Sequence, residues 1–550
     1  METKELQIRT LSSLAKVFPQ RIVGKVHTKA DGLRGTEVSF QVALRMKASR
    51  YKQADYEIKV ISELCDSITL YRVGLVPSAL PVYPHSFDEN YITSSPQLFP
   101  DPLLPIEDNT FCAAAYNWRA IWVTVNIGED LDAKEYPITL EFYRKGERKG
   151  RARFNISVHS ESLPESDFIY TDWFHCDCIA DVHGVKIFSE EHWSLIERYM
   201  RLASEHGMNM ILTPILTPAL DTAVGAERPT VQLVAVEKIG DEYKFDFSLL
   251  KRFVDTANRC GIERFEISHF FTQWGAGFTP KVVAKVDGRS RKIFGWHVSS
   301  LSTEYAVFLR ALVPQLISFF ESCGTPKENL YFHVSDEPYE THLERYHKVS
   351  ALLCPLIEGC KHIDALSSLS FYKKGLVGTP VVATNHIKPY LDEGVPEIWC
   401  YYCCSQSSKV SNRFFSMPSH RTRVIGVQMY KYGIKGFLHW GYNFYYTQLS
   451  KRLVDPFRET DAGEAFPSGD AFVVYPYEDG VIPSLRQKVF RDALNDMRLL
   501  TLLEAKIGKE QVAFELDRLM GEEITFESCP ESERFFDELY KMIFSYLESK

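Results

Sequence analysis

Polar and apolar residues alternate strictly over four segments of the first 160 residues. Every second residue from Val38 to Met46 is apolar, and the same period of two recurs at 121–127, 138–142 and 152–158. This period is typical of strands that bury one face, and a short polar turn joins the last two segments as a hairpin. Sheets of this kind are antiparallel. We therefore predict an N-terminal β-sandwich over residues 1–160.

After a polar linker the pattern changes to short apolar runs that alternate with amphipathic segments. The first amphipathic segment starts at Ser189, an N-cap residue type, continues with Glu190 and Glu191, and ends at Gly207. Apolar runs that read as strands occur at 168–174, 210–216, 265–271, 330–337, 363–371, 397–403 and 436–443. Helical segments between them favour a parallel sheet, and about eight such repeats favour a closed barrel.

We accordingly predict a multidomain α/β protein in which the β-sandwich is followed by a (β/α)8 TIM barrel with C-terminal helices. The barrel is assigned to residues 167–510 and includes a strongly amphipathic helix at 485–507. Residues 511–550 are assigned to a helical extension whose last helix spans about 531–547.

Composition narrows the class of protein. The 550 residues are 45% apolar and 25% charged, which is typical of a soluble globular protein. The net charge of −9 without a basic cluster argues against a nucleic-acid partner, and no apolar run reaches the roughly 20 residues that a membrane span needs. Residues 1–17 contain no apolar signal-peptide core, so we expect a cytoplasmic protein, in keeping with twelve irregularly spaced cysteines.

Two adjacent carboxylates, Asp336 and Glu337, end the apolar run that starts at Leu330, and Pro338 follows them. Proline cannot continue a strand ladder, and it favours extended backbone at the residue before it, so we expect Glu337 at an extended strand end. Carboxylates at the end of a buried strand are costly unless they are paired or solvated. A solvated strand end is the simpler interpretation, and a catalytic pair is the functional one.

Active sites of barrels lie at the carboxyl ends of the strands, and aromatic residues recur at these positions. A sugar ring has an apolar face and a polar rim, so aromatic walls with interspersed polar groups suit it. For any single aromatic residue, core packing is at least as good an explanation. The predicted substrate-binding residues are Trp173, His175, Asp177, His269, Trp274, Tyr372, Trp399, Tyr401, Trp440, Tyr442, Asn443 and Tyr445.

We predict neither a metal nor a cofactor. His175 and His269 have no third ligand at a supporting spacing, and the spacings Cys176-x-Cys178 and Cys403-Cys404 do not match a zinc framework. No glycine-rich dinucleotide or phosphate loop follows a predicted strand.

Four segments of the chain resemble glycoside hydrolase family 123. They are Phe332–Pro338, Gly436–Asn443, Tyr475-Pro476 leading into Ser484-Leu485-Arg486, and Arg491–Asp496. The resemblance extends from about residue 165 onward, and it departs from the family at Asn495-Asp496-Met497, where relatives carry a more acidic and aromatic run. Members are β-N-acetylgalactosaminidases with an N-terminal β-sandwich and a (β/α)8 barrel. The resemblance therefore implies a glycan with terminal β-linked N-acetylgalactosamine as the partner.

The resemblance also implies roles for the catalytic pair. Glu337 acts as general acid and base, while the 2-acetamido oxygen of the substrate attacks the anomeric carbon and Asp336 holds the acetamido N–H. We expect the pKa of Glu337 to be raised while Asp336 stays ionised. Two other classes remain open: a glycosidase on the same barrel that acts on a sugar without an acetamido group, and a non-catalytic carbohydrate-binding relative.

Overall fold

The chain folds into two compact units, each built from separate stretches of sequence. The computed structural model describes residues 5–48 and 50–548. The first unit comprises residues 1–166, 407–431 and 482–550, and the second comprises 167–406 and 432–481.

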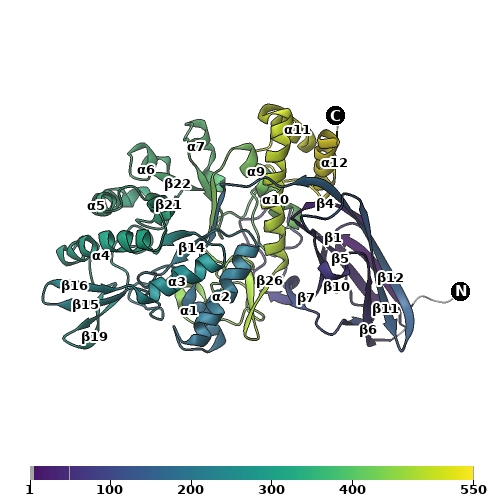
Figure 1. Ribbon diagram of the computed structural model, residues 1–550, viewed down its shortest axis with the longest axis horizontal. Coiled ribbons are helices and arrows are strands. Elements are labelled where there is room, and N and C mark those ends of the chain that lie inside the picture. Colours follow the sequence, from purple (N-terminus) through teal and green to yellow (C-terminus); the bar gives the residue numbers. More distant parts are fainter. Residues whose placement is uncertain (1–4, 49, 549–550) are drawn as a thin grey trace. The chain divides into compact units, whose positions relative to one another are not determined.

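Two five-stranded sheets make up the N-terminal part of the first unit (Figure 1). One sheet has the order β1 (Leu6–Ser12), β5 (Glu37–Met46), β10 (Arg119–Asn126), β7 (Ile68–Ser78) and β8 (Gln97–Pro105). The other has the order β4 (Lys29–Arg34), β12 (Glu147–Ser162), β11 (Glu135–Arg144), β6 (Gln53–Ile61) and β9 (Thr110–Ala114). Neighbouring strands are antiparallel except β12 and β4. A two-stranded ribbon, β2 (Lys16–Val17) and β3 (Ile22–Val23), lies outside both sheets.

The alternating apolar residues of the two sheets form one core, as the period of two predicts. Phe40 of β5 stacks on Phe154 of β12 with ring centroids 4.0 Å apart, and Ile121, Val123 and Val125 belong to the same buried cluster. The aromatic and branched side chains of the two sheets thus hold them together by burial.

Helices from distant parts of the sequence complete the first unit. They are α8 (Ser419–Arg423), α9 (Ile425–Lys431), α10 (Leu485–Ile507), α11 (Lys509–Met520) and α12 (Arg534–Glu548). Arg486 of α10 forms a buried ion pair with Asp101 of β8 at 2.9 Å, and Lys488 bonds Glu37 of β5 at 2.9 Å. Residues 407–431 and 482–510, which we assigned to the barrel from sequence, therefore pack with the N-terminal sheets and the C-terminal helices.

The second unit contains a nearly closed parallel barrel of eight strands. Their order is β13 (Ile169–Asp172), β24 (Gly436–His439), β23 (Trp399–Tyr401), β22 (Thr379–Ala383), β21 (Lys361–Leu366), β20 (Leu330–Phe332), β17 (Arg264–Ile267) and β14 (Met210–Thr213). Between the first and last strands, the backbone N–H of Asn209 donates to the carbonyl of Tyr170 at 3.2 Å. The interior is filled by apolar side chains such as Leu212, Ile363 and Val381, so the barrel is a packed core.

Helices of the second unit connect these strands (Figure 1). They are α1 (Cys176–His183), α2 (Glu190–Glu205), α3 (Ser248–Arg259), α4 (Thr303–Ser322), α5 (Leu343–Leu353), α6 (Leu369–Lys373) and α7 (Lys388–Asp392). The predicted N-cap is confirmed, because the Ser189 hydroxyl accepts the backbone N–H of His192 at 3.3 Å. In the described residues, no helix has the length and apolar character needed to cross a bilayer.

Two features of the second unit were not predicted. Strand β22 was missed, and a four-stranded sheet is inserted in the order β16 (Glu242–Asp246), β15 (Ala235–Ile239), β18 (Val282–Val286) and β19 (Arg289–Phe294). Strand β25 (Val474–Tyr477) follows the barrel, and β26 (Gly480–Pro483) comes before α10. The inserted sheet enlarges the connections that follow β14 and β17.

Candidate active site

A pocket of about 110 Å³ opens where the barrel strands end. Trp173 and His175 follow β13, Asp336 and Glu337 follow β20, and Trp440 follows β24. We call it the catalytic pocket, and its other lining residues are Leu220, Asp221, Gln273, Trp274, Ala365, Tyr401, Cys403, Cys404, Leu438 and Phe466.

The backbone of Glu337 differs from the sequence prediction. Its φ is +40°, in the left-handed region, although extended geometry was expected before Pro338. Two hydrogen bonds hold this turn: the N–H of Glu337 donates to the Ala365 carbonyl at 3.1 Å, and the N–H of Trp274 donates to the Asp336 carbonyl at 3.0 Å. A non-glycine residue in this region is strained, and such strain concentrates at functional sites. Neighbouring strand ends therefore force Glu337 into a position that its local sequence disfavours.

The carboxyl group of Glu337 is held by a tyrosine. Tyr401, at the end of β23, donates its hydroxyl to Glu337 Oε1 at 2.6 Å, and Cys403 Sγ lies 4.0 Å from the same oxygen. Burial raises the pKa of Glu337, the Tyr401 hydrogen bond lowers it, and the charge of Asp470 raises it again. The net rise agrees with the pKa expected for a general acid near neutral pH.

Asp336 also has a raised pKa, which the sequence analysis did not predict. Burial raises the pKa well above its usual range and the charge of Glu337 adds to the rise, whereas His333 lowers it. Two adjacent carboxyl groups in one pocket resist double ionisation. The pair therefore favours holding one proton between its two members.

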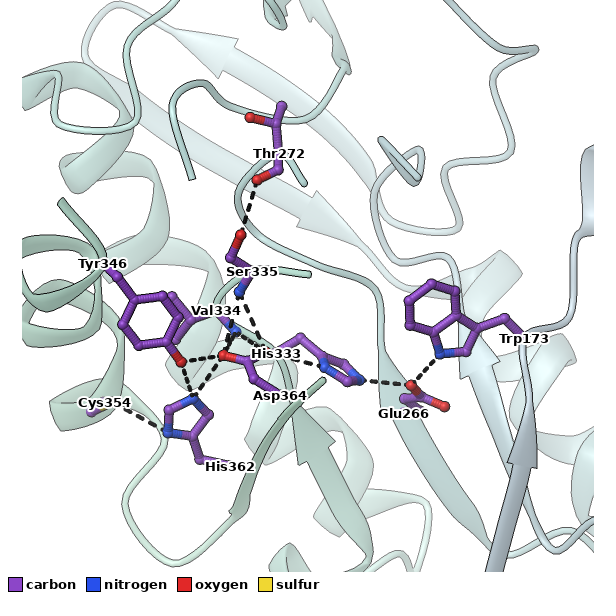
Figure 2. Close-up of polar contacts among 10 residues, drawn as sticks. All are labelled: Trp173, Glu266, Thr272, His333, Val334, Ser335, Tyr346, Cys354, His362 and Asp364. Carbon is purple, nitrogen blue, oxygen red and sulfur yellow. Dashed lines mark hydrogen bonds and ion pairs between the residues drawn. The ribbon is translucent and has the colours of Figure 1, made fainter. Parts of the chain in front are cut away.

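A buried chain of ionisable groups joins the ends of β17, β20 and β21 (Figure 2). His333 Nε2 is 2.6 Å from Glu266 Oε1, and its Nδ1 is 3.3 Å from Asp364 Oδ1. Burial alone would lower the pKa of His333, but its hydrogen bonds to Asp364 and Glu266 raise it to about 9. His333 is thus a buried imidazolium between two carboxylates, close enough to Asp336 to favour the ionised form of that carboxyl group.

The same chain fixes the backbone that leads to the pair. Asp364 accepts the backbone N–H groups of Val334 and Ser335 at 3.1 and 3.3 Å, as Figure 2 shows, and it also accepts the Tyr346 hydroxyl. The imidazole of His362 is 3.3 Å from Asp364 Oδ2. One carboxylate therefore anchors the segment that carries Asp336 and Glu337.

His269, His333 and Asp364 lie close enough together to raise the question of a metal site. The rings of His269 and His333 are stacked, with centroids 4.2 Å apart and planes inclined by 17°. Imidazole donates to a metal in the plane of its ring, so two stacked rings do not converge on one ion. Both nitrogens of His333 are also engaged by carboxylates. The geometry fits a neutral His269 packed on an imidazolium and does not fit a shared ligand set.

The aromatic walls of the pocket are oriented by acidic partners. Trp173 Nε1 donates to Glu266 Oε1 at 2.6 Å, and Trp440 Nε1 donates to Asp470 Oδ2 at 3.0 Å. Both indole rings therefore keep fixed positions, with their polar edges satisfied. A rigid aromatic wall can pack against a sugar face at little entropic cost.

His175 is held in one neutral form by its neighbours. Its Nε2 is 3.0 Å from the Trp440 carbonyl, and its Nδ1 is 3.2 Å from Arg228 Nη2. Arg228 in turn forms a bidentate ion pair with Asp177, both distances being 2.7 Å. Burial and the charge of Arg228 lower the pKa of His175 to about 4. Asp177 thus supports the wall through Arg228 and does not line the pocket.

The structure brings several predicted residues into the pocket and places others elsewhere. Trp173, His175, Trp274, Tyr401 and Trp440 line it together with the catalytic pair. Those that do not line it are Asp177, His269, Tyr372, Trp399, Tyr442, Asn443 and Tyr445.

The residues outside the pocket pack or form hydrogen bonds within the protein. Trp399 is part of the barrel core and Tyr372 lies in α6. Asn443 Nδ2 donates to the His175 carbonyl, while the hydroxyls of Tyr442 and Tyr445 donate to the carbonyls of Tyr199 and Val474. The geometry therefore indicates that these residues contact other parts of the protein, outside the pocket.

Sequence reasoning missed four acidic residues of the site. Glu266 and Asp364 interrupt apolar strands, and a charge inside a buried strand is a signal that was available. Asp221 lies in the connection after β14, several residues beyond the strand end, and burial raises its pKa to about 6. Asp470 lies about 30 residues after the end of β24, the last barrel strand, and no local pattern marks it.

Comparisons with known proteins bear on the family and on the fold. Residues 173–503 match the family model described as glycoside hydrolase 123, catalytic domain. The fold is similar to that of a family 123 glycoside hydrolase from Clostridium perfringens, with a TM-score of 0.75 and 12% identity over 98% of this chain and 99% of that one.

Other comparisons carry less information. A β-D-glucuronidase from Dictyoglomus thermophilum matches with a TM-score of 0.34 and 8% identity over 90% of this chain and 98% of that one. A Bacteroides ovatus family 5 xyloglucanase matches with a TM-score of 0.30 and 8% identity over 85% and 98%. These two scores are too low to bear on the fold. No curated protein sequence matches the chain.

Proposed function

The chain belongs to glycoside hydrolase family 123, and on that premise we propose that it removes β-linked N-acetylgalactosamine from the end of a glycan. The observation that carries the proposal is the adjacent pair Asp336 and Glu337 in a small pocket with aromatic walls. The pair favours holding one proton, because burial raises both pKa values and the charge of Glu337 raises the pKa of Asp336 further. A mechanism that needs one acid and one carboxylate matches this state.

In the proposed first step Glu337 is protonated and Asp336 is ionised. Glu337 gives its proton to the glycosidic oxygen as the bond from that oxygen to the anomeric carbon breaks. The 2-acetamido oxygen forms a bond to the anomeric carbon, and the product is an oxazolinium ion. Asp336 accepts the acetamido N–H and offsets the positive charge of this intermediate.

In the second step water attacks the anomeric carbon from the face that the leaving group vacated. Glu337 takes a proton from this water, and the bond between the anomeric carbon and the acetamido oxygen breaks. Two displacements at one carbon retain its configuration. His333 supports this division of labour, because its charge lowers the pKa of Asp336 and so favours the ionised form of that carboxyl group. Tyr401 fixes the position of Glu337 Oε1, although its hydrogen bond lowers the pKa of Glu337.

Two experiments test the proposal. The first compares hydrolysis of aryl glycosides of N-acetylgalactosamine, N-acetylglucosamine, galactose and glucose, and we expect hydrolysis of the first substrate above all. Comparable hydrolysis of galactosides would instead favour a glycosidase that does not use an acetamido group, and no hydrolysis of any would favour a carbohydrate-binding relative.

The second experiment uses a thiazoline analogue of N-acetylgalactosamine, which mimics the oxazolinium ion. Competitive inhibition far stronger than that by N-acetylgalactosamine itself is expected. Inhibition no stronger than that by the free sugar would argue against participation of the acetamido group.

A further inference from the structure

Two adjacent cysteines, Cys403 and Cys404, line the catalytic pocket, and no step of the proposed mechanism uses either thiol. They are the one adjacent pair among the twelve cysteines of the chain. Both are free thiols, and Cys403 is only 8% exposed whereas Cys404 is half-buried. A hydrogen bond joins the two thiols, so the sulfur atoms are neighbours in space as well as in sequence.

A short turn holds this pair of thiols just after the end of β23. The backbone N–H of Gln406 donates to the Cys403 carbonyl at 3.2 Å, and Gln406 Oε1 accepts the Cys403 N–H at 2.9 Å. Gln406 Nε2 in turn donates to Asn385 Oδ1 at 3.0 Å. The turn is therefore tied to the connection after β22, and its first two residues line the pocket.

The more buried thiol lies against the general acid of the proposed mechanism. Cys403 Sγ is 4.0 Å from Glu337 Oε1, the oxygen that also accepts the Tyr401 hydroxyl at 2.6 Å. Tyr401 stands two residues before Cys403 in the chain. A chemical change at Cys403 therefore acts on Glu337 through this contact and through the segment that carries Tyr401.

We propose that Cys403 and Cys404 form a reversible oxidation site, at which a peroxide converts the two thiols to a disulfide and lowers the activity of the enzyme. The effect on activity rests on the proposed function. The formation of the disulfide does not, because it depends only on the two thiols and the oxidant.

Cys404 reacts first because it is the more exposed thiol. Its sulfur attacks one oxygen of hydrogen peroxide, the O–O bond breaks, and a sulfenic acid and water are formed. The hydrogen bond to Cys404 and burial raise the pKa of Cys403 well above its usual range, so Cys403 remains a thiol until this point. The Cys403 sulfur then attacks the Cys404 sulfur, and the departing hydroxyl group takes the Cys403 proton and leaves as water.

A disulfide between neighbouring residues is strained and therefore easily reduced. Adjacent Cα atoms are about 3.8 Å apart across a trans peptide bond, whereas disulfides usually join Cα atoms about 4.4–6.8 Å apart. A thiol reductant accordingly restores the two thiols. To form the bond, the sulfur atoms must close to about 2.05 Å, which changes the contact between Cys403 and Glu337.

The test treats the full-length wild type with hydrogen peroxide and then follows both the thiols and the activity. After alkylation of free thiols, the tryptic peptide 375–409 should carry an alkyl group on Cys400 but none on Cys403 or Cys404. We expect kcat/KM for the aryl N-acetylgalactosaminide to fall about tenfold or more, because a shift of about 1 Å in a catalytic group can cost roughly 10²-fold. Dithiothreitol should restore both the alkylation pattern and the rate.

Two variants and a second substrate identify the thiols that respond. Each variant is compared with its own untreated activity: Cys404→Ser should keep that activity under oxidation, while Cys65→Ser, which removes an exposed thiol of the first unit, should lose it as the wild type does. The loss in the wild type should be larger for a sugar aglycone than for a dinitrophenyl leaving group, because the change acts on proton donation by Glu337.

Alkylation of Cys403 and Cys404 after oxidation, or a disulfide that leaves the rate unchanged, overturns the proposed oxidation site. Equal loss of activity in Cys404→Ser does so as well, because the responding thiol would then be a different one. If the untreated wild type hydrolyses no aryl glycoside, the proposed function has failed. In that case the peptide map still decides whether the disulfide forms.

Discussion

At the residue scale, the chemistry depends on how one proton is shared between Asp336 and Glu337. Both pKa values are raised by burial, and two contacts distinguish the partners: Tyr401 bonds Glu337 and the charge of His333 acts on Asp336. When an acetamido N–H donates to Asp336, the ionised form of this carboxyl group gains a hydrogen bond. Substrate binding is therefore expected to move the shared proton to Glu337, where the first step needs it.

Glu337→Gln should lose most activity on substrates with poor leaving groups. Proton donation typically contributes about 10²–10⁴-fold, and a dinitrophenyl leaving group needs little of it. Steady-state rates on a sugar aglycone and on the dinitrophenyl glycoside measure the difference. Glu340→Gln, at an exposed position three residues away, is the control. Wild-type rates in Glu337→Gln would remove this residue from the mechanism.

Asp336→Asn should lower kcat by roughly 10²–10³-fold, because a neutral amide still accepts the acetamido N–H but stabilises less positive charge. Azide should not rescue this variant to an inverted glycosyl azide, since no enzyme nucleophile has been lost. A fluoro-sugar should leave no adduct on Asp336, as judged by mass spectrometry of the intact protein. A covalent adduct there would place the enzyme among the retaining glycosidases that use two carboxylates.

His333 gives a prediction about pH. Its folded-state pKa of about 9 is above the ordinary 6.5, so the stability it contributes is present in full below pH 6.5. That stability should be lost as pH rises through about 9. Thermal unfolding of the wild type between pH 6 and 10 measures this fall.

The matched variant is His333→Gln, which leaves Glu266 buried without its cation and leaves Asp364 with His362 as its one remaining imidazole partner. Removing one partner of a buried ion pair typically costs about 3–5 kcal/mol, and the remaining fall in stability between pH 6.5 and 9 should be smaller than in the wild type. His347→Gln, on the exposed face of α5, should change neither the stability nor its dependence on pH. An unaltered pH profile in His333→Gln would mean that His333 is neutral in the folded protein.

At the element scale, strand ends are positioned by close packing inside the barrel. Gly436, the first residue of β24, lies against the ring of Trp399, and a Cβ there would be 2.3 Å from Trp399 Cδ2. The ring is fully buried and has no room to move. Glycine at this position thus lets β24 approach β23 and sets where Trp440 emerges.

Gly436→Ala should therefore destabilise the protein by about 1–3 kcal/mol, the usual cost of overpacking a core. Urea unfolding followed by tryptophan fluorescence measures it. Gly128→Ala, where a Cβ would meet nothing within 4 Å, should stay within about 0.5 kcal/mol of the wild type. Equal stability of the two variants would show that Trp399 can shift.

The sequence predicted the elements with a clear period and missed those without one. The limits of α2 and α10 were predicted to within a residue or two, because long amphipathic helices have capping residues and one apolar face. Strand β22 was missed because its five residues are all buried and lie between helices α6 and α7 of five residues each. Neither a period of two nor one of 3.6 is detectable in such short segments.

The site was predicted in part for a related reason. Position at a strand end identifies the face of the barrel, so Trp173, Tyr401 and Trp440 were found. It does not identify the direction of a side chain. Tyr445 follows a strand end as well, but its segment turns away and its hydroxyl bonds Val474.

The structure accounts for the departure from the family pattern at Asn495-Asp496-Met497. Asp496 lies where the chain departs from the family pattern. Its Oδ2 accepts a hydrogen bond from Arg423 Nε at 2.6 Å, and its Oδ1 accepts one from the Tyr540 hydroxyl at 2.8 Å. It ties α10 to α8 and α12 within the first unit. The departure therefore concerns packing of helices and does not touch the catalytic pocket.

At the scale of the whole molecule, the chemistry should not depend on a metal ion. The stacked rings of His269 and His333 do not present converging lone pairs, and carboxylates occupy both nitrogens of His333. Full activity is expected after exhaustive dialysis against a chelator, measured on the aryl glycoside. Activity that is lost on chelation and restored by zinc would contradict this expectation.

Local sequence patterns could not predict the division of the chain into two units. The sequence suggested one boundary near residue 160, and that boundary is close to the end of the first stretch at 166. Assigning residues 407–431 and 482–550 to the first unit requires contacts such as Arg486 with Asp101, whose partners are hundreds of residues apart. Periodicity describes a segment and its exposed face, but it does not say which distant segment will cover that face.

Because α10 bonds strands β5 and β8, the order of synthesis becomes important for this protein. The sheet that contains these strands leaves the ribosome complete once Asn126 has emerged, and α10 begins only at Leu485. At roughly 5–20 residues per second, the helix follows about 20–70 seconds later. During that interval the growing chain carries Asp101 and Glu37 without Arg486 and Lys488, so water must solvate these two carboxylates until α10 has been made.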